Sequence, residues 1–123
     1  RTCSMNNQQM ISHFVSAALD DALATGDNQI FLSSLPQESE DLRTQVVNLA
    51  ALQGVRLTGD PLILANGAAI QFLLVSSKTI AGYSGHTYAL NCFDETNFAD
   101  VSNLVLGLAM HEKYRTIFYS FEP

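Results

Sequence analysis

Histidine is the residue type in this chain most suited to proton transfer near neutral pH, and it occurs three times. His13 falls on the polar side of a helical pattern, and His86 follows Gly85 in a turn-like stretch. His111 begins the stretch HEKYR, which lacks the second histidine that a zinc-binding helix carries four residues on. We therefore interpret His13 as a surface residue and His86 as a turn residue, and we predict no metal site.

Motifs for nucleophilic or phosphate chemistry are missing from the sequence. There is no GxSxG nucleophile elbow, and the glycine-rich stretches NGAA and AGYSG lack the spacing and the lysine of a phosphate-binding loop. The acidic pairs Asp20–Asp21 and Glu40–Asp41 fall on exposed helix faces, whereas an acid–base pair needs one carboxyl group in an apolar pocket. We therefore predict no catalytic residue, no cofactor-binding residue and no cofactor.

Two cysteines, Cys3 and Cys92, leave two alternatives open. A disulfide between them would join the polar start of the chain to a strand and would indicate an oxidising compartment. The other alternative is a buried thiol at Cys92 and a free thiol at Cys3.

The composition is that of a globular, acidic chain. Of its 123 residues, 47% are hydrophobic and 15% are charged, and the net charge is −6. This charge argues against binding to nucleic acid and against docking on an anionic membrane. No apolar run approaches the roughly 20 residues that span a bilayer, so we expect no direct membrane insertion. We predict a polar leader over residues 1–9 and a single domain over 10–123.

The hydrophobic pattern predicts the elements that would hold a site. Apolar residues at helical spacing predict helices over 10–25, 39–53 and 99–113. Shorter apolar runs predict strands over 29–33, 55–57, 70–75, 86–93 and 114–121. The segment 60–67 fits a short helix or an extended strand equally well. The order α-β-α-β-(α)-β-β-α-β predicts an α+β domain in which about three helices pack on a mixed sheet.

Two features of this pattern concern the arrangement of the sheet and its surface. Strands 70–75 and 86–93 are expected to form a hairpin around the sequence GYSG, with 70–75 central because both of its faces are apolar. The third helix is unusually apolar, so it is either covered on both sides or used in an interface. The aromatic residues of the last strands either complete a small core or bind a protein partner or a second copy of the chain. The residues expected there are Leu106, Met110, Tyr114, Phe118, Tyr119 and Phe121.

The stretch from Leu52 to Asn97 resembles part of the TolB amino-terminal domain and of the FlgO- and CsgG-type outer-membrane lipoproteins of bacteria. In those proteins a helix and a short strand lead into a Gly-Ala step, a strand, and a returning strand that ends in Asp. Gly67-Ala68, the strand Phe72 to Ser76 and Asp94 take those places here. The resemblance implies a non-catalytic periplasmic module that assembles with other envelope proteins by pairing strands or helices.

The leading prediction is therefore a periplasmic or secreted interaction domain, lipoprotein-like, that serves as an accessory or assembly component of a bacterial envelope complex. Two alternatives stay open. One is a small enzyme whose Ser, His and acidic residues gather from separate segments. The other is an acidic regulator or inhibitor in the cytoplasm that binds a basic protein surface.

Overall fold

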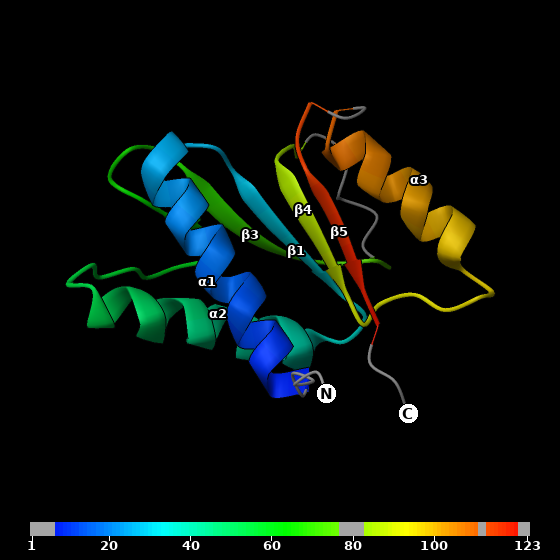
Figure 1. Cartoon of the computed structure of the whole chain (residues 1–123), viewed down its shortest axis with the longest axis horizontal. Coiled ribbons are helices and arrows are strands. Elements are labelled where there is room, and N and C mark those ends of the chain that lie inside the picture. Colours follow the sequence, from blue (N-terminus) through cyan, green and yellow to red (C-terminus); the bar gives the residue numbers. More distant parts are fainter. Residues whose placement is uncertain (1–6, 77–82, 111–112, 121–123) are drawn as a thin grey trace, which may run out of the picture.

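The computed structural model describes residues 7–76, 83–110 and 113–120, which form one sheet with helices on both of its faces (Figure 1). The elements follow one another in the order α1, β1, α2, β2, β3, β4, α3, β5. The strands lie in the sheet in the order β2-β3-β1-β4-β5. β1, β3, β4 and β5 run parallel to one another, and β2 pairs antiparallel with β3. The predicted class, three helices on a mixed sheet, is confirmed.

The helices occur where the apolar repeats predict them, with shifted ends. α1 spans Asn7–Thr25, α2 spans Pro36–Leu52 and α3 spans Phe98–Leu108. α1 includes residues 7–9 of the predicted polar leader, whereas residues 1–6 lie outside the described part; the division into leader and domain stays a prediction. α2 begins at Pro36 instead of the predicted Ser39, because proline fits the first turn of a helix.

The strands are β1 (Gln29–Ser33), β2 (Leu62–Ile63), β3 (Ala69–Leu74), β4 (His86–Leu90) and β5 (Thr116–Tyr119). The predicted strand over 55–57 is wrong, because this segment lies outside the sheet. The segment 60–67 forms no helix, and its extended alternative is correct, since it contains β2.

β1 is the centre of the sheet, and the predicted hairpin is wrong. β3 and β4 each pair with β1 in parallel, so that Phe31 lies opposite Phe72 on one side and Tyr88 on the other. All five residues of β1 are buried, whereas β3 lies one strand away from the centre. The connection between β3 and β4 therefore passes from one side of β1 to the other.

The two faces of the sheet have separate apolar cores. α1 and α2 pack on the face that carries Phe31, Tyr88 and Leu90, and α3 packs on the face that carries Leu32 and other alternate strand residues (Figure 1). Cys92 lies on the other face from Tyr88 and Leu90. β4 ends at Leu90, Asn91 takes a left-handed conformation with φ 53°, and Cys92 packs into the α3 core.

This arrangement creates a switch point between β1 and β4. The helix that follows β1 is α2, on one face, and the helix that follows β4 is α3, on the other face. Open α/β sheets bind their ligands outside the carboxyl ends of two such neighbouring strands. In the described part of the chain, no helix is both long and apolar enough to cross a membrane.

Candidate functional site

A cavity of about 170 Å³ lies at the switch point, outside the carboxyl ends of β1 and β4. The strands contribute Ser33 from the end of β1, and Leu90 and Asn91 from the end of β4. The first two turns of α1 and the first three turns of α2 supply the rest of the lining, namely Asn7, Gln8, Ile11, Glu38, Asp41, Leu42 and Gln45. Figure 1 shows the amino-terminal ends of both helices near this edge of the sheet.

Ser33 gives the cavity a buried hydroxyl group. Its side chain lies on the same face as that of Phe31, since strand residues alternate. Ser33 is 1% exposed, and its Oγ has no hydrogen-bond partner among the described residues. An unsatisfied buried hydroxyl costs about 1–3 kcal/mol, and a ligand that hydrogen-bonds to Ser33 would remove this penalty.

The cavity lies beside the start of the described part of α1 and carries two carboxylates, those of Glu38 and Asp41. The first N–H groups of a helix have no acceptor within the helix and carry the positive end of its dipole, which suits a phosphate group. The beginning of α2 is already partly neutralised, because Oε1 of Glu38 accepts hydrogen bonds from the backbone N–H groups of Ser34 and Leu35 and from the Ser34 hydroxyl at 3.0–3.3 Å. α2 therefore has little left to offer an anion, and α1 is described only from Asn7 onward.

The carboxylates that follow β4 lie outside the cavity lining. Asp94 is exposed, and its Oδ1 accepts hydrogen bonds from the backbone N–H groups of Thr96 and Asn97 and from the Thr96 hydroxyl at 2.6–3.2 Å. The hydrogen bonds from Thr96 and then from Asn97 lower the pKa of Asp94. Asp94 thus organises the turn before α3.

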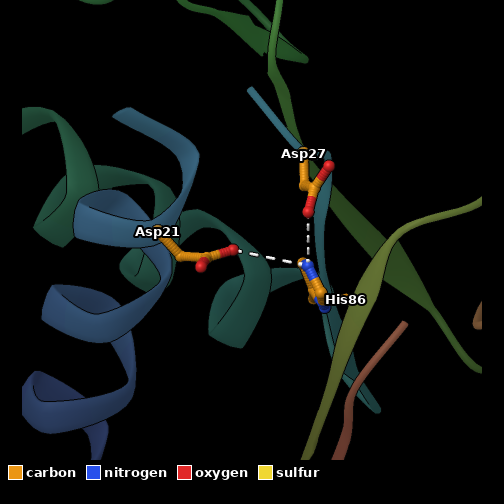
Figure 2. Close-up of side chains that lie close together, drawn as sticks. All are labelled: Asp21, Asp27 and His86. Carbon is orange, nitrogen blue, oxygen red and sulfur yellow. Dashed lines mark hydrogen bonds and ion pairs between the residues drawn. The ribbon is translucent and has the colours of Figure 1, made fainter. Parts of the chain in front are cut away.

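A second polar cluster lies at the opposite edge of the sheet, where β1 and β4 begin. Figure 2 shows Asp21 of α1 and Asp27, just before β1, both directed at His86. His86 Nε2 lies 3.0 Å from Asp27 Oδ2 and 3.4 Å from Asp21 Oδ2. Among the described residues, these three form the group whose ligand atoms, all within 4.8 Å of one another, could hold a metal ion.

The hydrogen bonds around His86 argue against a metal ion in this cluster. The backbone N–H of Arg115 donates to His86 Nδ1 at 2.9 Å, so in the neutral ring Nε2 carries the proton and donates to Asp27. A metal ion on Nε2 needs the opposite tautomer, with the proton on Nδ1.

Asp21 is also occupied by other groups. Its Oδ2 accepts a hydrogen bond from Gln29 Nε2 at 2.8 Å and lies 3.2 Å from Arg115 Nη2. Asp21, Asp27, His86 and Arg115, here termed the amino-edge clamp, therefore join α1, β4 and the start of β5.

The structure adds to the sequence interpretation of two titratable residues. His86 opens the strand as expected, but it is 8% exposed and belongs to the clamp, so turn chemistry alone does not account for it. Asp21 is half-buried in the same clamp, whereas its neighbour Asp20 is exposed as expected. His13 is also exposed as expected, and His111 lies outside the described residues.

The residues predicted for an interface are distributed over different parts of the molecule. Leu106 and Met110 are exposed on α3 and just after it, whereas Phe118 packs against the α3 core. Tyr119 lies on the α1 side of the sheet, and the ring of Tyr114 contacts His86 at 5.1 Å between centroids. Phe121 lies outside the described residues, and the role of this set in an interface stays a prediction.

Cys92 is buried in the α3 core, and this burial raises the pKa of its thiol to about 11. Cys3 lies outside the described residues, so a disulfide between the two cysteines stays a prediction.

Two curated phage proteins are similar to this chain. The chain is 38% identical over 109 residues to a probable terminase, ATPase subunit, of Haemophilus phage HP1, and 36% identical over 109 residues to the terminase ATPase subunit of Escherichia phage P2. Each alignment covers 88% of this chain but 18% of the relative, so the chain spans less than a fifth of the length of the relatives that it matches. No family model and no solved structure matches the chain.

These similarities overturn the resemblance to TolB, FlgO and CsgG proteins. The prediction of an exported, lipoprotein-like component of a bacterial envelope, periplasmic or secreted, is wrong, because the two curated proteins similar to this chain are described as ATPase subunits of phage terminases. The same finding replaces the alternative of an acidic regulator. The resemblance rested on an order of elements and on a few positions such as Gly67-Ala68. These features occur in many unrelated proteins that contain a sheet. Both relatives are described as subunits, and this chain is similar to one segment of them.

Proposed function

We propose that this chain is a segment of the ATPase subunit of a phage terminase, a DNA-packaging enzyme, and that its switch-point cavity holds phosphate groups of a nucleotide. The observation that carries the proposal is the buried hydroxyl of Ser33, which has no partner among the described residues and lines the cavity together with the start of the described part of α1. The descriptions of the two relatives as ATPase subunits support ATP as the nucleotide.

The size of the cavity suits phosphate groups better than a whole nucleotide. Its volume is about 170 Å³, whereas sites that enclose a small organic molecule measure about 300–1,000 Å³. A phosphate beside the first turn of α1 would accept hydrogen bonds from the helix N–H groups, and the Ser33 hydroxyl would donate one from the strand side. The sugar and the base would extend beyond the cavity, toward other parts of the subunit.

The residues of this cavity do not fit the magnesium ion that nucleotide hydrolysis ordinarily uses. P-loop NTPases hold that ion partly through an aspartate of the Walker-B strand. The strand ends that line this cavity carry Ser33, Leu90 and Asn91 instead. The lining carboxylates come from α2, where Glu38 holds the turn before the helix and Asp41 Oδ1 accepts a hydrogen bond from Gln37 at 2.8 Å. No magnesium-dependent step is therefore assigned to this segment.

The partners in this proposal are other parts of the ATPase subunit and other subunits of the terminase. No direct contact between this segment and DNA is proposed.

The proposal is tested by calorimetric titration of the purified chain with ATP and with inorganic tripolyphosphate. We expect both ligands to bind and to compete, and we expect adenosine not to bind, because the cavity holds phosphate groups. Ser33→Ala should weaken binding by about tenfold, since a hydrogen bond to a charged group contributes about 1.5–3 kcal/mol.

Ser39→Ala is the matched control variant. The Ser39 hydroxyl is also buried and unpaired in the described structure, but Ser39 does not line the cavity. Equal binding by the two variants would contradict the role of Ser33. Absence of binding by both ATP and tripolyphosphate would remove the proposed function.

A further inference from the structure

We infer that the outer edge of β5 receives a further parallel strand, formed by the part of the subunit that leads into α1. The inference goes beyond the proposed phosphate site and rests on the proposed function in one respect, namely that this chain is a segment of a longer subunit. The matched segment is 18% of each relative, so most of such a subunit lies outside it.

The outer side of β5 carries backbone groups that can pair with another strand. Among the described residues, β5 is the last strand on its side of the sheet. The Thr87 N–H donates to the Arg115 carbonyl at 2.9 Å, so Arg115 and every second residue after it face β4. Because the peptide groups of a strand alternate in direction, the N–H and C=O groups of Thr116 and Phe118 point away from β4.

β5 also lacks side chains that protect a strand edge from pairing. Protected edges usually carry charged residues or proline. β5 consists of Thr116, Ile117, Phe118 and Tyr119, none of which is charged. The ring of Phe118 lies 5.3 Å between centroids from that of Phe98, which is 44% exposed. The edge therefore offers backbone groups together with apolar side chains, the combination to which an added strand binds.

The hand of the connections indicates which strand fills this edge. From β1 the chain crosses to β3 through α2, and from β4 it crosses in the opposite direction to β5 through α3, on the other face. These two connections have the same hand, and connections between parallel strands are almost always right-handed. α1 lies on the face of α2, so a parallel strand before α1 reaches β1 with this hand only from the β4 side. β4 and β5 occupy the next two places, which leaves the outer edge of β5.

The position of α1 agrees with such a connection. The ring of Phe14 in α1 lies 6.4 Å from that of Tyr88 in β4 and 5.6 Å from that of Tyr119 in β5, so α1 covers the two strands that the connection would cross. The described part of α1 begins at the carboxyl edge, where Asn7 Oδ1 accepts a hydrogen bond from the Tyr119 hydroxyl at 3.1 Å, and α1 ends near the start of β1 (Figure 1). A strand that leads into α1 thus ends at the carboxyl edge and runs parallel to β5.

Two extended forms of this chain test the inference. The amino-extended form carries at its beginning the stretch that precedes the matched segment in the phage P2 subunit, and the carboxyl-extended form carries at its end the stretch that follows it. Amide hydrogen exchange is measured by NMR for the chain and for both forms. The N–H groups of Thr116 and Phe118 face outward, whereas that of Ile117 faces β4 and is the internal control.

We expect the amino-extended form to exchange at Thr116 and Phe118 at least about tenfold more slowly than the chain itself, because a paired N–H exchanges only when the pairing opens. Ile117 should change little, and the carboxyl-extended form should exchange as the chain does. Tripling or more of the chain concentration should leave its own exchange unchanged.

Thr116→Pro provides a second test, because it removes an outward N–H and no hydrogen bond to β4. It should abolish the added protection of Phe118 in the amino-extended form. Thr116→Ala is the matched control, since it keeps the N–H and should keep the protection. Circular dichroism checks the fold of each variant, and exchange in the unsubstituted forms is decisive even if the proline variant does not fold.

Three results would overturn the inference. Protection by the carboxyl-extended form alone would show that the added strand follows β5 in the subunit. Protection that grows with the concentration of the unextended chain would show that a second copy occupies the edge. Absence of protection in both extended forms would leave the edge without a strand. None of these results depends on phosphate binding, which the titrations with ATP and tripolyphosphate decide separately.

Discussion

The backbone N–H of Arg115 donates to Nδ1 of His86 at 2.9 Å, and this hydrogen bond sets the tautomer of the ring at the amino edge of the sheet. Because Nδ1 is an acceptor, Nε2 carries the proton of the neutral ring and points it at Asp27, 3.0 Å away. One side chain thereby connects the start of β4 to the start of β5 and to the segment between α1 and β1. The clamp holds the sheet at the edge opposite the cavity.

His86→Ala should destabilise the protein by roughly 1–3 kcal/mol, because it removes the acceptor of the Arg115 N–H and the donor to the Asp27 carboxylate. The free energy of unfolding is measured in urea at pH 7. His13→Ala is the control, since His13 is exposed and its loss should change stability by less than about 0.5 kcal/mol. Equal effects of the two substitutions would show that His86 in the clamp contributes nothing to the free energy of unfolding.

Zinc ions should give no increase in melting temperature that depends on His86. Nε2 of the ring is protonated, and Asp21 Oδ2 already contacts Gln29 and Arg115. Thermal unfolding of the wild type and of His86→Ala is compared with and without one equivalent of Zn²⁺. A stabilisation by zinc that disappears in His86→Ala would refute the tautomer and indicate a metal site in the clamp.

Two glycines should respond to alanine with opposite signs. A Cβ atom at Gly85 would lie 2.5 Å from the Asn28 carbonyl oxygen, so Gly85→Ala must displace the backbone between β1 and β4. Gly107 lies inside α3 with no neighbouring atom within 4 Å of an added Cβ, so Gly107→Ala should stabilise the protein by about 0.5–1 kcal/mol. Urea unfolding of both variants measures the signs, and stabilisation by Gly85→Ala would contradict the close approach.

Tyr88 should make the protein lose stability at alkaline pH. Burial raises the pKa of Tyr88 to about 12, whereas a tyrosine in the unfolded chain loses its proton near pH 10. The folded state therefore binds this proton more tightly, so its stabilising effect is complete below about pH 10 and disappears as the pH rises toward 12.

Tyr88→Phe separates this titration from the hydrogen bond that Tyr88 donates to Gln29 Oε1 at 2.8 Å. At neutral pH the variant should be about 1–3 kcal/mol less stable, because the buried Gln29 carbonyl loses its donor. As the pH rises above 10, the stabilities of variant and wild type should converge. The free energy of unfolding is measured in urea across this pH range, with Tyr83→Phe as an exposed control. If the curves of the wild type and of Tyr88→Phe against pH stayed parallel, the raised pKa of Tyr88 would be disproved.

The helices could be predicted from the sequence because their signal is local. Residues such as Phe14 and Val15 in α1, or Leu42 and Val46 in α2, recur at helical spacing, and all four are buried against the sheet. Strand pairing depends instead on segments far apart in the chain. The connection between β3 and β4 appeared to be a hairpin turn, although both strands pair with β1. The helix between β1 and β3 was the available signal for parallel strands.

The two polar sites could not be recognised for a related reason. His86 and Asp27 are 59 residues apart and meet only because β4 lies beside β1. Ser33 and Asn91 fall inside the predicted strands 29–33 and 86–93 and carry no chemical motif in the sequence. Their position at a cavity follows from the switch point. Once the parallel order is known, the end of β1 at Ser33, just before a helix that starts with Pro36, marks the edge where a ligand is expected.

Ser33 should show opposite effects on stability and on binding. Its hydroxyl is buried without a partner in the described structure, so Ser33→Ala should raise the free energy of unfolding of the ligand-free protein by up to about 1 kcal/mol. Ser39→Ala should raise it similarly, for the same reason. Tripolyphosphate should then stabilise the wild type and Ser39→Ala against urea, but Ser33→Ala much less, because a ligand stabilises only the state that binds it. If Ser33→Ala proved less stable than the wild type without ligand, the hydroxyl would have a partner within the protein, and its role in holding phosphate would lose its physical basis.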